Sequence, residues 1–248
     1  MITLRYIIAV FVLVPSTGVF ALAAMISCLF SRRSLPTSVM RNWARYWLWL
    51  AGIQLDIKGL EHVDPKKPAI YMANHASIID IPILIWALPV DLRFIFKKSI
   101  LYIPLVGLAI FLMGMIPIDR ARRSKARESL KKAGDRIRNG SHVLIFPEGT
   151  RSHSGDMLPF KKGGFYLAIQ EHIDIIPITI RNSRQLCGRN SIMAKSGVIH
   201  IAIHERFHTR EISLGQRSDA IARVRKIIDT ERNTTPQQIK KVAQTQMN

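Results

Sequence analysis

The sequence predicts an α/β protein with a mixed, mostly parallel sheet flanked by helices, preceded by an N-terminal two-helix membrane motif. Three observations lead to this prediction. Short β-type runs alternate with helical segments through most of the chain, as in sheets covered by helices on both faces. An uncharged apolar run of bilayer length stands near the N-terminus. A segment rich in tryptophan and arginine directly follows that run.

The apolar run extends from Ile7 to Phe30 without a charged side chain, which is long enough to cross the hydrocarbon core of a bilayer. Residues 21–23, Ala-Leu-Ala, resemble a signal-peptidase site, but the apolar run continues past them, so an uncleaved anchor fits better. Pro15 and Gly18 lie within the run, so a kinked or re-entrant segment competes with a straight span.

The following segment, residues 37–51, holds three of the four tryptophans together with Arg41 and Arg45. Indole rings mixed with arginine predict a helix at the level of the lipid headgroups, and an ordinary core helix is the alternative. Arginines cluster after the apolar run, while Arg5 alone precedes it. This positive-inside bias places the rest of the chain in the cytoplasm.

Charge and cysteine content narrow the class of partner. The 36 Lys and Arg against 17 Asp and Glu give a formal net charge of +19, which favours an anionic partner. The basic residues are spread along the chain and the aromatic residues gather beside the apolar run, so an anionic membrane is favoured over nucleic acid. Cys28 and Cys187 are the only cysteines, and we expect no disulfide between them.

Changes in composition along the sequence divide the chain into a membrane-anchoring segment at 1–52, an α/β domain at 53–230 and a polar tail at 231–248. The expected strands are 54–58, 69–73, 92–96, 115–118, 142–146, 175–180 and 197–204. The expected helices are 122–138, 163–171 and 218–228. Asn139-Gly140 is expected to stop the first of these helices, and Ser218 to cap the last.

Polar residues interrupt the apolar stretch that follows the second expected strand. Asn74 and His75 fall at the end of that strand, where α/β proteins usually place ligands. Asp80, five residues beyond His75, can bind one imidazole nitrogen and leave the other as a general base, although a chance pairing is the alternative. No Gly-x-Ser-x-Gly motif occurs, so the substrate itself would supply the attacking hydroxyl.

A second motif, Phe-Pro-Glu-Gly-Thr-Arg-Ser at 146–152, follows another strand. Gly149 allows a positive φ and a close approach of the backbone to a ligand, and Arg151 offers a planar fork suited to phosphate. Arg120 and Lys98 also follow strands, so cationic side chains recur at strand ends, although any one of them taken alone is more often a solvated surface charge. His200 and His204 alternate on a strand but have no carboxylate or cysteine at a ligand spacing, so no metal site is expected.

Four blocks in this order, NHASIID, GMIPIDR, FPEGTRS and IIPITI, resemble those of the glycerolipid acyltransferases, specifically the bacterial 1-acyl-sn-glycerol-3-phosphate acyltransferases. The resemblance implies that His75 is the general base and that Asp80 orients it. It implies that the substrate-binding residues around the glycerol phosphate are Arg120, Glu148, Gly149 and Arg151. Lys98 and Thr150 are further candidates for this set. Pro117-Ile118-Asp119, which precede Arg120, depart from the aliphatic pattern, and Pro117 is expected only at a sheet edge or a bulge.

The resemblance implies transfer of an acyl group from a thioester of acyl carrier protein or coenzyme A to the 2-hydroxyl of lysophosphatidic acid. No cofactor and no metal are expected. The expected setting is an anionic phospholipid membrane, the bacterial inner membrane, with the active site on its cytoplasmic face. Transfer to another lysolipid or to glycerol 3-phosphate is the alternative, and a non-catalytic basic membrane-binding protein is a more distant one.

Overall fold

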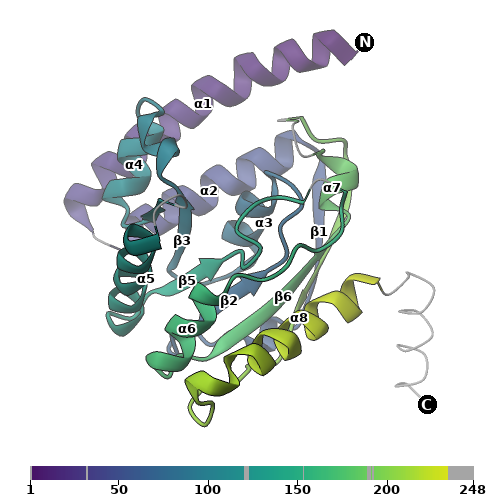
Figure 1. Ribbon diagram of the computed structural model, residues 1–248. Coiled ribbons are helices and arrows are strands. Elements are labelled where there is room, and N and C mark those ends of the chain that lie inside the picture. The colour runs from purple at the N-terminus through teal and green to yellow at the C-terminus, as the bar shows by residue number, and fades with distance from the viewer. Residues whose placement is uncertain are drawn as a thin grey trace.

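The computed structural model describes residues 2–31, 33–119, 123–152, 154–188, 191 and 193–233. Within them, one seven-stranded sheet has the order β1-β7-β6-β2-β5-β3-β4 (Figure 1). Its strands are β1 Ile53–Lys58, β2 Ile70–Ala73, β3 Leu92–Lys97, β4 Ile116–Ile118, β5 His142–Ile145, β6 Ile175–Arg181 and β7 Gly197–Ile203. The pairs from β6 through β4 are parallel, and only the β6–β7 pair is antiparallel. The predicted mixed, mostly parallel sheet is confirmed.

All seven predicted strands form. They could be recognised in the sequence because each type of strand has its own pattern of buried and exposed residues. The central strands β2 and β5 are buried along their whole length, so they read as continuous apolar runs. The edge strand β1 alternates between buried or half-buried and exposed residues. Pro117 lies in β4, which ends the sheet, so its predicted edge position is confirmed.

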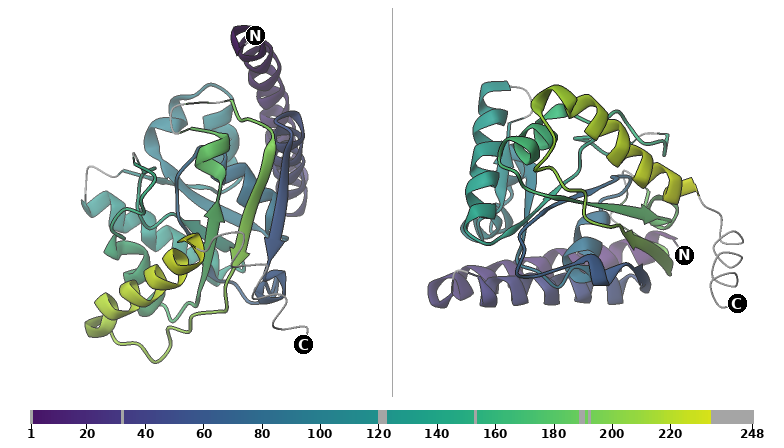
Figure 2. Two further views of the ribbon diagram at one scale, coloured as in Figure 1. Left: turned by 90° about the vertical axis from the view of Figure 1, so that its right-hand side faces the viewer. Right: turned by 90° about the horizontal axis from the view of Figure 1, so that it is seen from below.

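Helices cover both faces of the sheet, as expected (Figure 2). Along β2, Tyr71 and Ala73 belong to one hydrophobic core and Ile70 and Met72 to the other, as the two-residue period of a strand requires. The first core includes side chains of α2 Ser34–Leu50 and α3 Asp80–Ala87. The second includes side chains of α5 Arg123–Arg138, α6 Lys162–Gln170 and α8 Arg217–Asn233.

The helix ends partly follow the predictions. α5 ends at Arg138, and Asn139 and Gly140 follow it, with Gly140 at φ +83°, so the expected stop is confirmed. The expected cap of α8 at Ser218 is wrong, because the helix already begins at Arg217 after a 3-10 turn, η3 Leu214–Gln216. Ser213 forms a capping box at the start of that turn. Short elements that the sequence did not predict are η1 Leu60–His62, η2 Lys98–Tyr102, α4 Val106–Leu112 and α7 Ser183–Leu186.

The N-terminal apolar run forms one helix, α1 Ile2–Phe30, which continues through Pro15. Its stretch Phe11–Phe30 is long and apolar enough to cross a membrane. The hydroxyls of Ser16 and Thr17 donate to main-chain carbonyls one turn earlier in the same helix, so these polar groups are satisfied internally. α1 packs against α2 and α4 (Figure 1).

Helix α2 belongs to the core of the α/β body on one of its faces. Met40, Ala44 and Leu48 recur at helical spacing and are buried in the core shared with α3. Arg41 and Arg45 lie over the ring of Trp86 at 5.3 and 5.5 Å, and Arg41 donates to the carbonyl of Leu88. The alternative of a core helix is therefore right for this face. Most of the predicted polar tail lies outside the described residues.

Candidate active site

His75 and Asp80 meet at the carboxyl end of β2. His75 lies in the turn after the strand, and Asp80 is the first residue of α3. The imidazole Nδ1 is 2.9 Å from Oδ2 of Asp80, whose side chain is fully buried. The same Oδ2 accepts the main-chain N–H groups of Ala76 and Ser77 at 2.8 Å each. An oxygen that already accepts two N–H groups also accepts from Nδ1, which leaves Nε2 to take up a proton.

The imidazole of His75 is fixed from a second side by the loop that follows β5. Its ring stacks on Phe146, with centroids 4.0 Å apart and an interplanar angle of 17°. Its main-chain N–H donates to Oε1 of Glu148 over 2.7 Å, and its carbonyl accepts the N–H of Ser152 over 3.2 Å. β2 and β5 are parallel neighbours, so the loops after them share one edge of the sheet. The structure therefore brings the two sequence motifs together at one edge of the sheet.

Glu148 uses both carboxylate oxygens on main-chain N–H groups. Oε1 accepts from His75, and Oε2 accepts from Leu158 over 2.7 Å. Burial raises the pKa of Glu148, and the N–H groups of His75 and Leu158 partly oppose that shift. The described contacts of its carboxylate therefore join the turn to the loop, while its predicted role in binding substrate stays a prediction.

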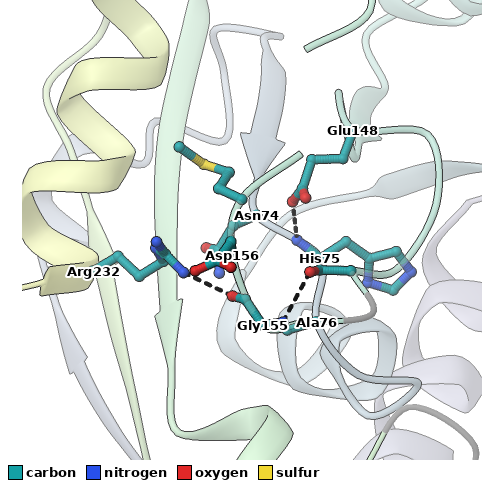
Figure 3. Close-up of a pocket in the computed structure, with 9 residues that line it drawn as sticks. Asn74, His75, Ala76, Glu148, Gly155, Asp156 and Arg232 are labelled. Atoms are coloured by element: carbon teal, nitrogen blue, oxygen red, sulfur yellow. Dashed lines mark hydrogen bonds between the residues drawn. The ribbon is translucent and has the colours of Figure 1, made fainter. Parts of the chain in front are cut away.

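Two arginines of α8 hold the same loop, and sequence reasoning missed them. Arg225 of α8 donates to the carbonyls of Leu158 and Met157. Arg232, at the end of α8, donates to the carbonyl of Gly155 over 2.8 Å (Figure 3). The residues that these contacts join are separated in the sequence by 67, 68 and 77 positions, so no local pattern could have revealed the contacts.

Two further polar side chains fasten the His75 turn to its surroundings. The amide of Asn74 exchanges two hydrogen bonds, of 2.9 and 2.8 Å, with the main chain of Ile180 in β6. The buried hydroxyl of Ser77 donates to the carbonyl of Cys187 over 2.6 Å. Buried polar groups are tolerated when they are hydrogen-bonded, which explains the polar residues in this apolar stretch.

A small cavity of about 10 Å³ lies behind the turn, between the main chain of His75 and Arg232. The imidazole points away from the side on which Gly155, Asp156 and Arg232 lie (Figure 3). This volume suits about one water molecule. We therefore assign the cavity to the support of the turn and not to substrate.

The loop after β5 also brings a lysine close to Gly149. Gly149 has φ +72°, a backbone conformation that favours glycine, and a Cβ atom there would lie 2.8 Å from Nζ of Lys161, so the lysine amine lies close over this residue. Sequence reasoning missed Lys161, and its signal was a Lys-Lys-Gly-Gly run at the start of α6. Thr150 is exposed and Arg151 half-buried in the same loop.

The structure describes only one of the two remaining cationic residues that were predicted to bind substrate. Lys98 is exposed after β3, and β5 separates β3 from β2 in the sheet. Arg120 lies outside the described residues. In the part of the chain that the structure describes, no group of three or more His, Cys, Asp or Glu is arranged to hold a metal ion. Both cysteines are free thiols.

Two other His–Asp pairs show what sets His75 apart. His200 Nδ1 lies 2.8 Å from Asp56, and His208 Nδ1 lies 3.1 Å from Asp174. Both of those histidines are at least one-third exposed, whereas the side chain of His75 is 12% exposed and its partner is fully buried. The site is therefore that of an α/β protein with one buried, oriented His–Asp pair at the carboxyl ends of parallel strands.

Comparisons with known proteins agree with that class. The chain matches the sequence model of the Acyltransferase family over residues 54–181, and it belongs to this acyltransferase family. It is 43% identical over 134 residues to a protein of Limnanthes alba named 1-acyl-sn-glycerol-3-phosphate acyltransferase, covering 54% of this chain and 47% of that one. A protein of Borreliella burgdorferi with the same name is 33% identical over 166 residues, covering 67% of this chain and 66% of that one.

The match spans about half the length of the plant relatives. The fold is shared with the crystal structure of the 1-acyl-sn-glycerophosphate (LPA) acyltransferase, PlsC, from Thermotoga maritima, at a TM-score of 0.79 and 21% identity. That alignment covers 93% of this chain and 96% of the other. It leaves 7% of this chain unaligned (100% − 93%), fewer residues than lie on either side of the family match, so the shared fold extends beyond that match in both directions.

Proposed function

We propose that this chain is a membrane-associated O-acyltransferase that moves a fatty acyl group from a thioester to the free 2-hydroxyl of 1-acyl-sn-glycerol 3-phosphate. The observation that carries the proposal is the buried His75–Asp80 pair, with Nδ1 bound and Nε2 available. Relatives named for this activity support the choice of acceptor.

In the proposed reaction, Nε2 of His75 takes the proton of the acceptor hydroxyl as its oxygen attacks the thioester carbon. Asp80 stabilises the imidazolium that forms and keeps the ring in one orientation. The tetrahedral intermediate then collapses, the carbon–sulfur bond breaks, and the departing thiolate receives the proton from the imidazolium. The products are phosphatidic acid and a free thiol, and the imidazole returns to its neutral form.

The oxyanion of the intermediate needs hydrogen-bond donors. The main-chain N–H groups of His75, Ala76 and Ser77 already serve the carboxylates of Glu148 and Asp80. In the loop after β5, the N–H of Thr150 makes no hydrogen bond within the described part of the chain. We therefore assign an oxyanion donor to this loop, with Thr150 as the first candidate.

The acceptor phosphate would lie against the cationic side chains of the same edge. Arg151 offers a fork that matches phosphate, and the amine of Lys161 lies over Gly149 of the same loop. Arg120 and Lys98 complete the proposed set. Fixing the phosphate fixes the hydroxyl relative to Nε2, and such positioning lowers the entropic part of the barrier.

We further propose that α1 anchors the protein in the bacterial inner membrane with the active site on the cytoplasmic face, and that acyl carrier protein or coenzyme A carries the acyl group. The apolar stretch Phe11–Phe30 and the net charge of +19 support attachment to an anionic membrane. No cofactor or metal takes part in the proposed steps.

The function is tested with purified full-length chain in detergent, offered 1-acylglycerol 3-phosphate, glycerol 3-phosphate and lysophosphatidylcholine with each thioester donor. We expect phosphatidic acid and stoichiometric release of thiol with the first acceptor. Preference for glycerol 3-phosphate or for the choline lysolipid would reassign the acceptor. No transfer to any acceptor, from a chain that is folded by circular dichroism, would contradict the proposed activity.

A further inference from the structure

The segment between β3 and β4 carries its apolar side chains on the outside. Six large apolar residues of η2, α4 and the short connection between them are exposed: Tyr102, Ile103, Leu105, Leu108, Phe111 and Leu112. The buried positions of α4 are the small Gly107 and Ala109. A helix on a water-facing surface has the reverse arrangement, with polar residues outside. We call the six exposed residues the α4 apolar face.

This face adjoins the apolar surface of α1. α4 packs against α1, and a Cβ atom on Gly18 would lie 3.8 Å from Cδ1 of Leu105. α1 is itself apolar on its exposed side, including Val14, Val19 and Leu22 near that contact. Contiguous apolar patches of this extent are rare on soluble monomers and mark surfaces that meet another apolar phase.

The surroundings of the face indicate a lipid surface as its partner. Lys97 and Lys98, both exposed, stand at its start, where ammonium groups can pair with phosphate headgroups. The face follows the carboxyl end of β3, and β3, β5 and β2 run in parallel. It therefore borders the same edge of the sheet as His75, which follows β2.

We propose that the α4 apolar face is a second membrane-inserting element, which seats the edge carrying His75 on the bilayer so that a lipid acceptor enters laterally from the membrane. This proposal rests on the membrane-associated function given above. It goes beyond α1 as the anchor, because it fixes which edge of the sheet faces the lipid.

Depth-dependent quenching tests the insertion directly. A fluorophore is attached to cysteine at Phe111→Cys, in full-length chain carrying Cys28→Ser and keeping the buried Cys187. The protein is reconstituted in vesicles of phosphatidylethanolamine and phosphatidylglycerol containing a lipid with a nitroxide on its acyl chain. The matched control is Leu214→Cys, an exposed leucine in η3. η3 directly precedes α8, whose buried side chains belong to the second core, whereas Ala109 of α4 belongs to the first.

We expect strong quenching at position 111 and none at position 214. Equal, weak quenching at both positions would overturn the proposal. Protection of the label at position 111 in detergent without lipid, together with a dimeric mass, would assign the face to a second copy of the chain and would also overturn it.

An activity comparison separates this proposal from the proposed function. The double variant Leu108→Ser/Phe111→Ser is compared with Leu60→Ser/Leu214→Ser, which alters exposed leucines elsewhere. We expect the first variant to lose on the order of tenfold in turnover of vesicle-embedded acceptor, and to keep its turnover of detergent-dispersed acceptor. Unchanged turnover on vesicles would contradict the proposal, while absence of transfer by the wild type in detergent would contradict the proposed function instead.

Discussion

The main-chain N–H of His75 donates to Oε1 of Glu148 over 2.7 Å, which joins the turn after β2 to the loop after β5. The second oxygen of Glu148 binds the N–H of Leu158. Arg225 of α8 in turn donates to the carbonyl of Leu158. A continuous series of hydrogen bonds therefore runs from the last helix to the proposed base.

This series predicts that Arg225 positions the site without touching substrate. Arg225→Met should lower kcat by roughly tenfold with little change in the KM of either substrate, because a main-chain tie to the loop is lost. Arg225→Lys should recover part of the loss, since an ammonium can still donate to a carbonyl. The measurement is steady-state kinetics with each substrate varied in turn.

Arg223→Met is the matched control for Arg225. Arg223 lies on the same helix and also stacks on an aromatic ring, Phe207, at 4.9 Å, as Arg225 does on Phe160 at 5.4 Å. Equal losses in the two methionine variants would show that the effect belongs to helix packing and not to the loop.

Asp80→Asn should reduce kcat by about 10²- to 10⁴-fold, because an amide cannot stabilise the imidazolium and favours the wrong tautomer. It should also lower the melting temperature, since Oδ2 holds the N–H groups of Ala76 and Ser77. Asp56→Asn, which alters the exposed partner of His200, should leave both quantities near wild type. Turnover of Asp80→Asn close to wild type would remove Asp80 from the mechanism.

Arg151→Ala should raise the KM of the phosphorylated acceptor roughly ten- to hundredfold and leave that of the thioester donor nearly unchanged. A charge-assisted, two-pronged contact to phosphate is lost, and Arg151→Lys should recover little because it lacks the fork. Initial rates measured against the concentration of each substrate distinguish a phosphate-binding role from a structural role. Equal changes in both KM values would make Arg151 a structural residue.

Burial lowers the pKa of His142, which packs beside Tyr71 with ring centroids 5.6 Å apart. Below the ordinary value of 6.5 the unfolded chain binds a proton that the folded chain does not, so stability falls as pH decreases from about 7.5 toward the lowered pKa. Titration of His142 changes the free energy of unfolding by at most about 1.4 kcal/mol per pH unit.

His142→Gln should flatten this dependence. The measurement is the free energy of unfolding in denaturant, in a fixed detergent, across that pH range. His200→Gln, at an exposed site, is the control. An identical pH dependence in wild type and His142→Gln would show that His142 does not titrate in this way.

The parts of the fold that depend on short-range pattern could be predicted from the sequence. The strands followed from apolar runs and alternation, and the end of α5 from Gly140. The proximity of His75 and Asp80 followed from a five-residue spacing and is confirmed by the 2.9 Å distance, while their roles stay predictions.

The rest depends on long-range packing. α4 was missed because its apolar residues face outward, so its pattern does not mark a core helix. The links to Arg225 and Lys161 were missed because tertiary structure alone brings those side chains to the loop. α2 was only partly predicted, because it combines the exposed Trp49 with a stripe of core residues that tertiary packing buries.

In the proposed reaction the buried His75–Asp80 pair, and not another His–Asp pair of the chain, takes the proton of the acceptor hydroxyl. The direct measurement is the rate of phosphatidic acid formation from labelled acyl thioester by wild type, His75→Ala and His200→Ala, each purified in detergent and checked for folding. We predict that His75→Ala loses about 10²- to 10⁴-fold, while His200→Ala stays near wild type. Near wild-type transfer by a folded His75→Ala variant would contradict the account.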